Sequence, residues 1–113
     1  MAAVSWKGGS GNWTDSNWAG TATYPGASDN VSVSVAGAYT LTINSAVAAH
    51  SFTLNDSSAT IADNGTLTLS GANPTLTLTA GAFDLAGSIV GGTIKDAGSR
   101  MVFAGGTLSG VTY

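Results

Sequence analysis

Short runs in which an apolar residue alternates with Ser or Thr fill the chain from position 31 onward, and they restrict its fold more than any other feature. The clearest runs are VSVSV at 31–35, YTLTI at 39–43, SFTL at 51–54, ATIA at 59–62, TLTLS at 66–70 and TLTLT at 75–79. A period of two places the apolar side chains on one face, which is the pattern of a half-buried β-strand. The short breaks between the runs, such as AG, DNG and GANP, are typical of turns. The sequence therefore predicts an all-β fold.

Composition narrows the class of protein further. A chain of 113 residues is about one domain and can bury a core without disulfides. Only 8% of the residues are charged and the net charge is −3, so the clustered Lys and Arg that bind phosphates are missing and no nucleic-acid partner is expected. The absence of Cys excludes disulfides and thiolate metal sites. No run approaches the roughly 18 apolar residues of a membrane span.

Two architectures fit short strands at this spacing, a parallel β-helix (β-solenoid) and an antiparallel β-sandwich. TLTLSGANP is followed by TLTLTAGAF after nine residues, and GGTIKDAG recurs as GGTLSGVT after fourteen. Short strands, short breaks and inward residues that are mostly Leu, Ile and Val favour the solenoid, in which stacked coils share one narrow core. The sandwich is kept as the alternative.

The domain prediction is a single β-solenoid over residues 1–113. Residues 1–30 form a Trp-rich N-terminal cap, and residues 31–113 form short-strand coils that continue or stack beyond Tyr113. A cap is needed because the first coil of a solenoid otherwise exposes strand edges and a cross-section of the core. Large aromatic side chains suit this role, since each buries on the order of 150–250 Å².

Two segments resemble a known class of proteins. The opening run WKGGSGNWTDSNWAGTATYPGASDNVSVSVAGAYTLTI and the tail GGTIKDAGSRMVFAGGTLSGVTY are similar to bacterial extracellular right-handed β-helix repeat proteins, including autotransporter passenger and adhesin-like surface proteins. The resemblance implies a parallel β-helix that is secreted or displayed on a bacterial cell surface. It also implies a cap formed by the segment from Trp6 to Pro25.

The Trp-rich opening is the best candidate for a binding site. A sugar-stacking platform with polar side chains that bind the hydroxyl groups would use Trp6, Trp13, Trp18, Tyr24, Asn12, Asp15 and Asn17. In the other interpretation, the rings pack inward as the cap and their indole N–H groups bind loop carbonyls. The cap interpretation is preferred, because this chain has few other large residues that would close its end.

Metal binding and catalysis have little support in the sequence. The segment GGSGNW begins like a calcium-binding GGxGxD repeat, but Trp13 replaces the ligand Asp, so Ca²⁺ is not favoured and no cofactor is expected. Asp29, Asp56 and Asp63 are interpreted as turn formers. Asp84 and Asp96 are the one candidate pair of glycosidase acids, and His50 is a lone histidine. We therefore expect no enzymatic activity.

The function predicted from these features is structural. The chain is expected to be a module of a bacterial extracellular surface protein, acting as a stalk, an adhesin scaffold or a self-assembling filament subunit. Its expected partner is another copy that stacks end to end, or the remainder of a longer solenoid. The alternative is a carbohydrate-binding module that uses the Trp-rich segment. A third hypothesis is contact with ice or mineral through the Thr residues of TLTLS and TLTLT.

Overall fold

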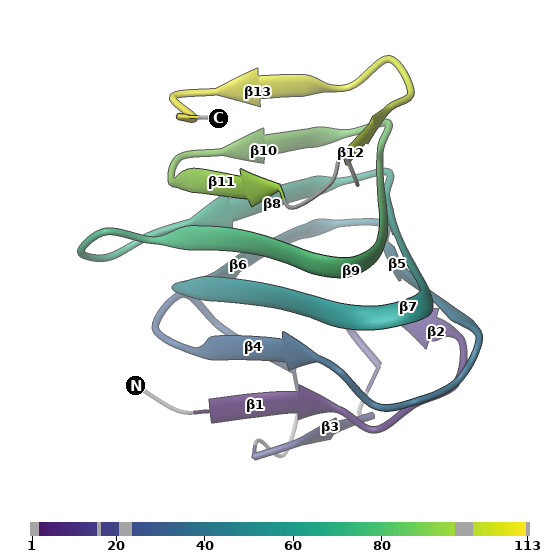
Figure 1. The fold of residues 1–113 in the computed structure, drawn as a ribbon. Coiled ribbons are helices and arrows are strands. Elements are labelled where there is room, and N and C mark those ends of the chain that lie inside the picture. The colour runs from purple at the N-terminus through teal and green to yellow at the C-terminus, as the bar shows by residue number, and fades with distance from the viewer. Residues whose placement is uncertain (1–2, 16, 21–23, 97–100, 113) are drawn as a thin grey trace.

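The computed structural model describes residues 3–15, 17–20, 24–96 and 101–112, which form a β-solenoid of about four turns (Figure 1). Its strands are β1 (Ala3–Trp6), β2 (Gly11–Asn12), β3 (Trp18–Ala19), β4 (Asn30–Val33), β5 (Tyr39–Ile43), β6 (Ala46–Ala49), β7 (Ser51–Asp63), β8 (Thr66–Leu69), β9 (Thr75–Leu85), β10 (Ser88–Val90), β11 (Thr93–Asp96), β12 (Met101–Phe103) and β13 (Thr107–Ser109). Among these strands, β1 and β3 form an antiparallel pair, and the other pairs are parallel. The predicted β-solenoid is confirmed. The β-sandwich alternative is wrong, because a sandwich requires antiparallel neighbours throughout.

The chain winds over three faces that run along the solenoid. The first face stacks β1, β4, the beginning of β7, the beginning of β9, and β11. The second stacks β2, β5, the ends of β7 and β9, and β12. The third stacks β6, β8, β10 and β13. The long strands β7 and β9 cross from the first face to the second, and their register shifts between Leu54 and Thr60 at this corner.

Apolar side chains from the three faces meet in one core. Burial alternates along most of the strands, as in the TLTL run of β8, whose two Leu residues are buried and whose Thr residues are partly exposed. Each face contributes inward columns, in which one residue lies above the equivalent residue of the previous coil. Three such columns are Val31–Phe52–Leu76–Ile94, Leu41–Ile61–Phe83–Met101 and Val47–Leu67–Ile89–Leu108. Successive coils thus bury each other's apolar faces.

The two sequence repeats do not correspond to stacked coils. The first TLTL is β8, on the third face, whereas the second begins β9, on the first face. The stacking partner of Thr66 is instead Ser88, and above that Thr107. The nine-residue step therefore separates neighbouring faces of the solenoid. The Thr residues of TLTLS and TLTLT consequently do not form one array, as a regular ice- or mineral-contacting surface would require.

Parallel coil pairing begins inside the segment that the sequence interpretation assigned to the cap. The strand β1 already lies parallel to β4, with Val4 beside Val31, and β2 lies parallel to β5. The antiparallel strand β3 covers the free edge of β1 and places Trp18 beside Trp6. The end of the solenoid is thus closed by β3 and its tryptophan, beneath a first coil that has the same pairing as the later ones.

Glycines lie at the corner between the second and third faces, where successive coils approach closely. A Cβ atom added to Gly87 would collide with the backbone oxygen of Gly65 in the coil below. A Cβ atom added to Gly106 would lie 2.6 Å from the backbone oxygen of Leu85. Backbone atoms of the preceding coil leave no room for a side chain, so these positions require glycine for space.

We expect Gly87→Ala to lower the free energy of unfolding by about 1–3 kcal/mol, because the added methyl group must push two coils apart. Gly26→Ala is the matched control, since the nearest atom to its new Cβ would be Asp29 Oδ2 at 3.9 Å. Urea unfolding of both variants measures the difference. Equal unfolding midpoints for the two variants would contradict the close approach at the Gly87 corner.

Candidate functional site

The three tryptophans form a cluster at the N-terminal end of the core. Trp6 ends β1, Trp13 follows β2 and Trp18 begins β3, so three separate elements deliver one ring each. The ring centroids of Trp6 and Trp18 are 4.9 Å apart, and those of Trp13 and Trp18 are 5.3 Å apart, both in edge-to-face geometry. Each side chain exposes 2% or less of its surface. The indole faces are therefore covered by protein.

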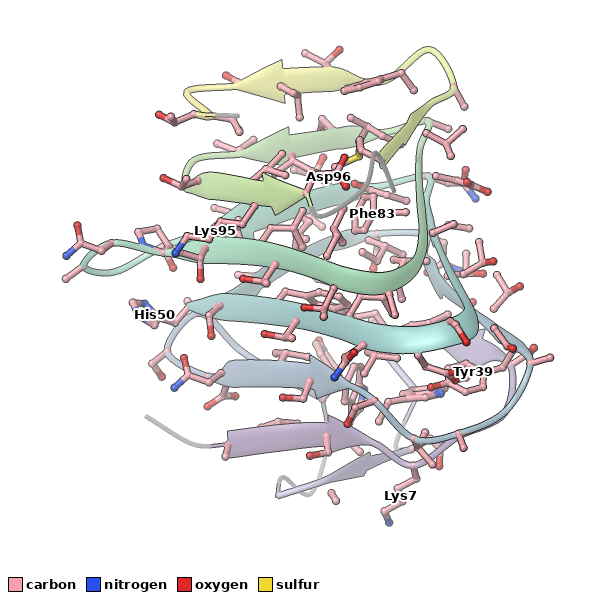
Figure 2. The ribbon with its side chains drawn as sticks, in the orientation of Figure 1. Lys7, Tyr39, His50, Phe83, Lys95 and Asp96 are labelled. Atoms are coloured by element: carbon pink, nitrogen blue, oxygen red, sulfur yellow. The ribbon has the colours of Figure 1, made fainter. Side chains whose placement is uncertain are left out.

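The aromatic packing continues from this cluster into the solenoid. Trp13 stacks on Phe52 of β7 with a centroid distance of 5.5 Å, and Phe52 meets Phe83 of β9 edge to face at 6.5 Å. Figure 2 shows Phe83 pointing into the interior between the coils. The tryptophans are thus the first members of a buried aromatic row, and removal of one ring would leave a large void beside the next.

Two of the indole N–H groups bind loop carbonyls, as the cap interpretation predicts. Trp6 Nε1 donates to the backbone oxygen of Gly9 at 2.9 Å, and Trp18 Nε1 donates to that of Trp13 at 2.8 Å. Trp13 Nε1 is buried and has no hydrogen-bond partner among the described residues. The two hydrogen bonds fix the rings against the loop that precedes β3.

Two of the polar residues proposed to bind a sugar, Asp15 and Asn17, instead form hydrogen bonds within the loop that carries the tryptophans. The Asp15 carboxylate accepts a hydrogen bond from the Asn12 backbone N–H at 2.9 Å, and Asn17 Nδ2 donates to the Gly8 oxygen at 2.7 Å. Tyr24 is 44% exposed, so it does not share the buried position of the indoles. The structure brings the tryptophans together as packed rings, and it leaves a sugar no exposed indole face among them on which to stack.

The aspartates differ in their surroundings. Asp29 accepts from the Gly26 N–H at 2.8 Å in a turn, as predicted. Asp56 accepts from the Ser58 N–H at 3.2 Å, but it lies inside strand β7, at the corner where the register shifts, and not in a turn between strands. The prediction for Asp63 is wrong, because its side chain is fully buried and its oxygens have no hydrogen-bond partner of good geometry in the part of the chain that the structure describes. Its register position lies between Ile43 and Leu85, which turns it into the core instead of the turn.

The pKa values of two side chains reflect burial. Burial raises the pKa of Asp63 to about 7, and the nearby Gly65 backbone amide offsets only part of this effect. Burial is also the main reason that the pKa of Tyr39 rises to about 12, with the negative charge of Asp56 adding to it. The Tyr39 hydroxyl donates to the Val35 oxygen at 2.7 Å, so this tyrosine is a packing residue with a satisfied polar end.

The candidate catalytic residues lie on different segments of the solenoid. Asp84 pairs with Val102 on the second face, whereas Asp96 ends β11 on the first face, and its carboxylate accepts from the Met101 N–H at 3.1 Å. His50 Nδ1 lies 2.7 Å from the Ser70 oxygen and donates to it at the corner between coils. Figure 2 places His50 near one corner of the coils, away from the labelled Asp96.

The sequence predicts coils that continue or stack beyond Tyr113, but sequence reasoning did not identify the residues that form the surface at this end of the solenoid. Phe103 on β12 occupies an inward register position above Leu85, yet it is 58% exposed, whereas Leu85 is fully buried. Leu108 lies above the fully buried Ile89 and is itself only partly buried. These are inward positions of the coil formed by β11, β12 and β13, and no described coil covers them. Alternation predicts which residues point inward, but not which inward positions remain exposed.

Strand edges accompany this apolar surface. β13 is the terminal strand of its sheet, and β12 pairs only with β9 among the described strands. After β13 the chain returns to the first face, where the Thr112 N–H donates to the Gly92 oxygen at 3.0 Å and the Ile94 N–H donates to Thr112 at 2.7 Å. We call the surface formed by β12, β13, Leu108 and Val111 the open end.

Comparisons with protein-family models, curated proteins and solved structures gave no match to this chain. The described residues contain no pocket and no group of three or more acidic or histidine side chains placed to hold a metal ion. No helix long and apolar enough to cross a membrane occurs in that part of the chain. The features that the structure defines are thus the class, a β-solenoid, and its two unlike ends.

Proposed function

We propose that this chain is a structural module of a bacterial extracellular surface protein, and that it works by stacking its open end on another β-coil. The observation that carries the proposal is the exposure of inward core positions at that end, above all Phe103. The location outside the cell rests on the resemblance of the opening and tail segments to extracellular β-helix proteins. Glycan binding by the tryptophans is not proposed, because their faces are buried.

The open end has the two features that stacking requires. Edge strands offer unpaired backbone groups, which favour the addition of another strand. The exposed apolar residues supply the driving force, because covering them removes their surface from water. When the chain is alone in solution, the coil available to cover the end is that of a second copy.

We therefore expect the protein to self-associate in sedimentation velocity experiments between about 10 µM and 1 mM, and Phe103→Asp to weaken the association about tenfold or more. A carboxylate at this position would have to be buried against apolar surface in the complex. Since Phe103 is more than half exposed in the single chain, the substitution should change the free energy of unfolding by less than about 1 kcal/mol.

Tyr24→Asp is the matched control, because it also removes an exposed aromatic ring and adds one negative charge, but lies outside the open end. It should self-associate as the unsubstituted chain does. A monomer throughout the concentration range for the unsubstituted chain, or equal weakening by both variants, would overturn the proposed stacking surface.

A further inference from the structure

The two ends of the solenoid differ in shape. At the N-terminal end, β1 and then β3 lie beyond β4 on the first face, whereas the third face ends at β6 (Figure 1). At the open end, the three faces finish within one coil, at the segment around Thr112, at β12 and at β13. The N-terminal end is therefore stepped, and the open end is comparatively level.

The two ends also differ in how their cores are covered. The tryptophans close the N-terminal end, and even at the edge strand β6 the inward Val47 and Ala49 are 6% and 0% exposed. At the open end, by contrast, Phe103 is 58% exposed. Among the described residues, inward core positions are thus exposed at the open end and buried at the N-terminal end. Head-to-tail growth needs two complementary ends, whereas a single self-complementary surface gives a closed pair.

The geometry points to a closed, twofold-symmetric dimer in which two copies meet open end to open end, an inference that rests on the stacking function proposed above. A twofold axis across the open end places β13 antiparallel to the β13 of the second copy. Thr107 of each copy then faces Ser109 of the other. Leu108, the central residue of the strand and part of the inward column above Ile89, lies at the axis and faces its own equivalent.

The composition of this surface allows such a pair. The charged residues described in the coil of β11 to β13 are Lys95 and Asp96. Lys95 lies at an outward position beside Thr77, away from the open end, and the inward carboxylate of Asp96 accepts a hydrogen bond from the Met101 N–H within the same chain. The Cα extents of 30 × 28 × 23 Å limit the cross-section of the solenoid. Two ends of this size bury on the order of 1,000 Å² in total, which is near the lower limit of specific interfaces and predicts a dimer of modest affinity.

Single-cysteine variants test the arrangement without background, because the chain has no Cys. A mixture of Thr107→Cys and Ser109→Cys chains should form a mixed disulfide under mild oxidation, because these positions oppose each other in the twofold dimer. A mixture of Thr107→Cys and Ala46→Cys reports head-to-tail stacking instead. Ala46, Thr66, Ser88 and Thr107 form one column, which a following copy would continue with its own Ala46.

We expect about tenfold more mixed disulfide from the first pair than from the second, together with a sedimentation mass that levels off at twice 11.1 kDa. A mass that keeps rising with concentration, with the second pair linking preferentially, would overturn the closed dimer and leave the stacking function standing. A chain that stays monomeric would overturn both. Unfolding curves of the three single-cysteine variants confirm that each is folded under the conditions of the test.

Discussion

Trp18→Ala is expected to lower the free energy of unfolding by about 3–5 kcal/mol, the range for removal of a large buried aromatic side chain. Trp18 is 2% exposed and touches the rings of both Trp6 and Trp13. The substitution leaves a void between two indoles and removes the hydrogen bond that Trp18 Nε1 donates to the Trp13 oxygen. Urea unfolding followed by circular dichroism measures the loss.

The same variant separates the cap interpretation from the glycan interpretation. Tyr24→Ala, which truncates an exposed ring, should change the free energy of unfolding by less than about 0.5 kcal/mol. The loss of unfolding free energy in Trp18→Phe should lie between the losses in Trp18→Ala and Tyr24→Ala, because Phe retains a ring but lacks the indole N–H. If Trp18→Ala unfolds at the same urea concentration as the unsubstituted chain but loses affinity for a glycan, the tryptophans are a binding platform and not a cap.

The fold could be predicted largely because alternation of apolar and polar residues with a period of two is specific to half-buried β-strands. In YTLTI and both TLTL runs, alternate residues point inward as the pattern indicates. The burial of the tryptophans also followed from physical need, since a chain of small residues has few large side chains with which to fill its core. Such predictions require only local geometry and the cost of exposed apolar surface.

The placement of strands in coils could not be predicted, because similar segments serve different faces. Nothing local distinguishes β8 on the third face from the beginning of β9 on the first. The prediction that Asp63 is a turn former was wrong for a related reason. The DNG motif signals a turn, but the parity of β7 sets the Asp63 side chain in the inward column between Ile43 and Leu85. The register of β7 against β5 and β9 therefore decides whether the Asp63 side chain lies in a turn or in the core. This register depends on how the coils stack and cannot be predicted from the local sequence.

Asp63 should make the stability of the protein depend on pH. Its pKa rises from 3.8 to about 7 on folding, because burial disfavours the charged form. Below pH 4 the carboxyl is protonated in both states and has no effect. Between pH 4 and 7 the unfolded chain ionises and the folded chain does not, so the free energy of unfolding falls by about 1.4 kcal/mol per pH unit. Above pH 7 the loss levels off at about 4 kcal/mol.

Asp63→Asn tests this account, because the variant keeps the shape of the side chain but cannot ionise. The difference in free energy of unfolding between Asp63→Asn and the unsubstituted chain should grow in favour of the variant from pH 4 to pH 7 and then stay constant. Asp29→Asn is the control, since Asp29 is partly exposed and bonded in a turn, and it should leave the Asp63-dependent slope in place. Asp63→Leu should be more stable still at pH 8, because Leu matches the apolar column formed by Ile43 and Leu85 and places no polar atom at this buried position. Parallel stability curves for Asp63→Asn and the unsubstituted chain from pH 4 to pH 8 would show that the Asp63 carboxyl ionises as easily in the folded protein as in water.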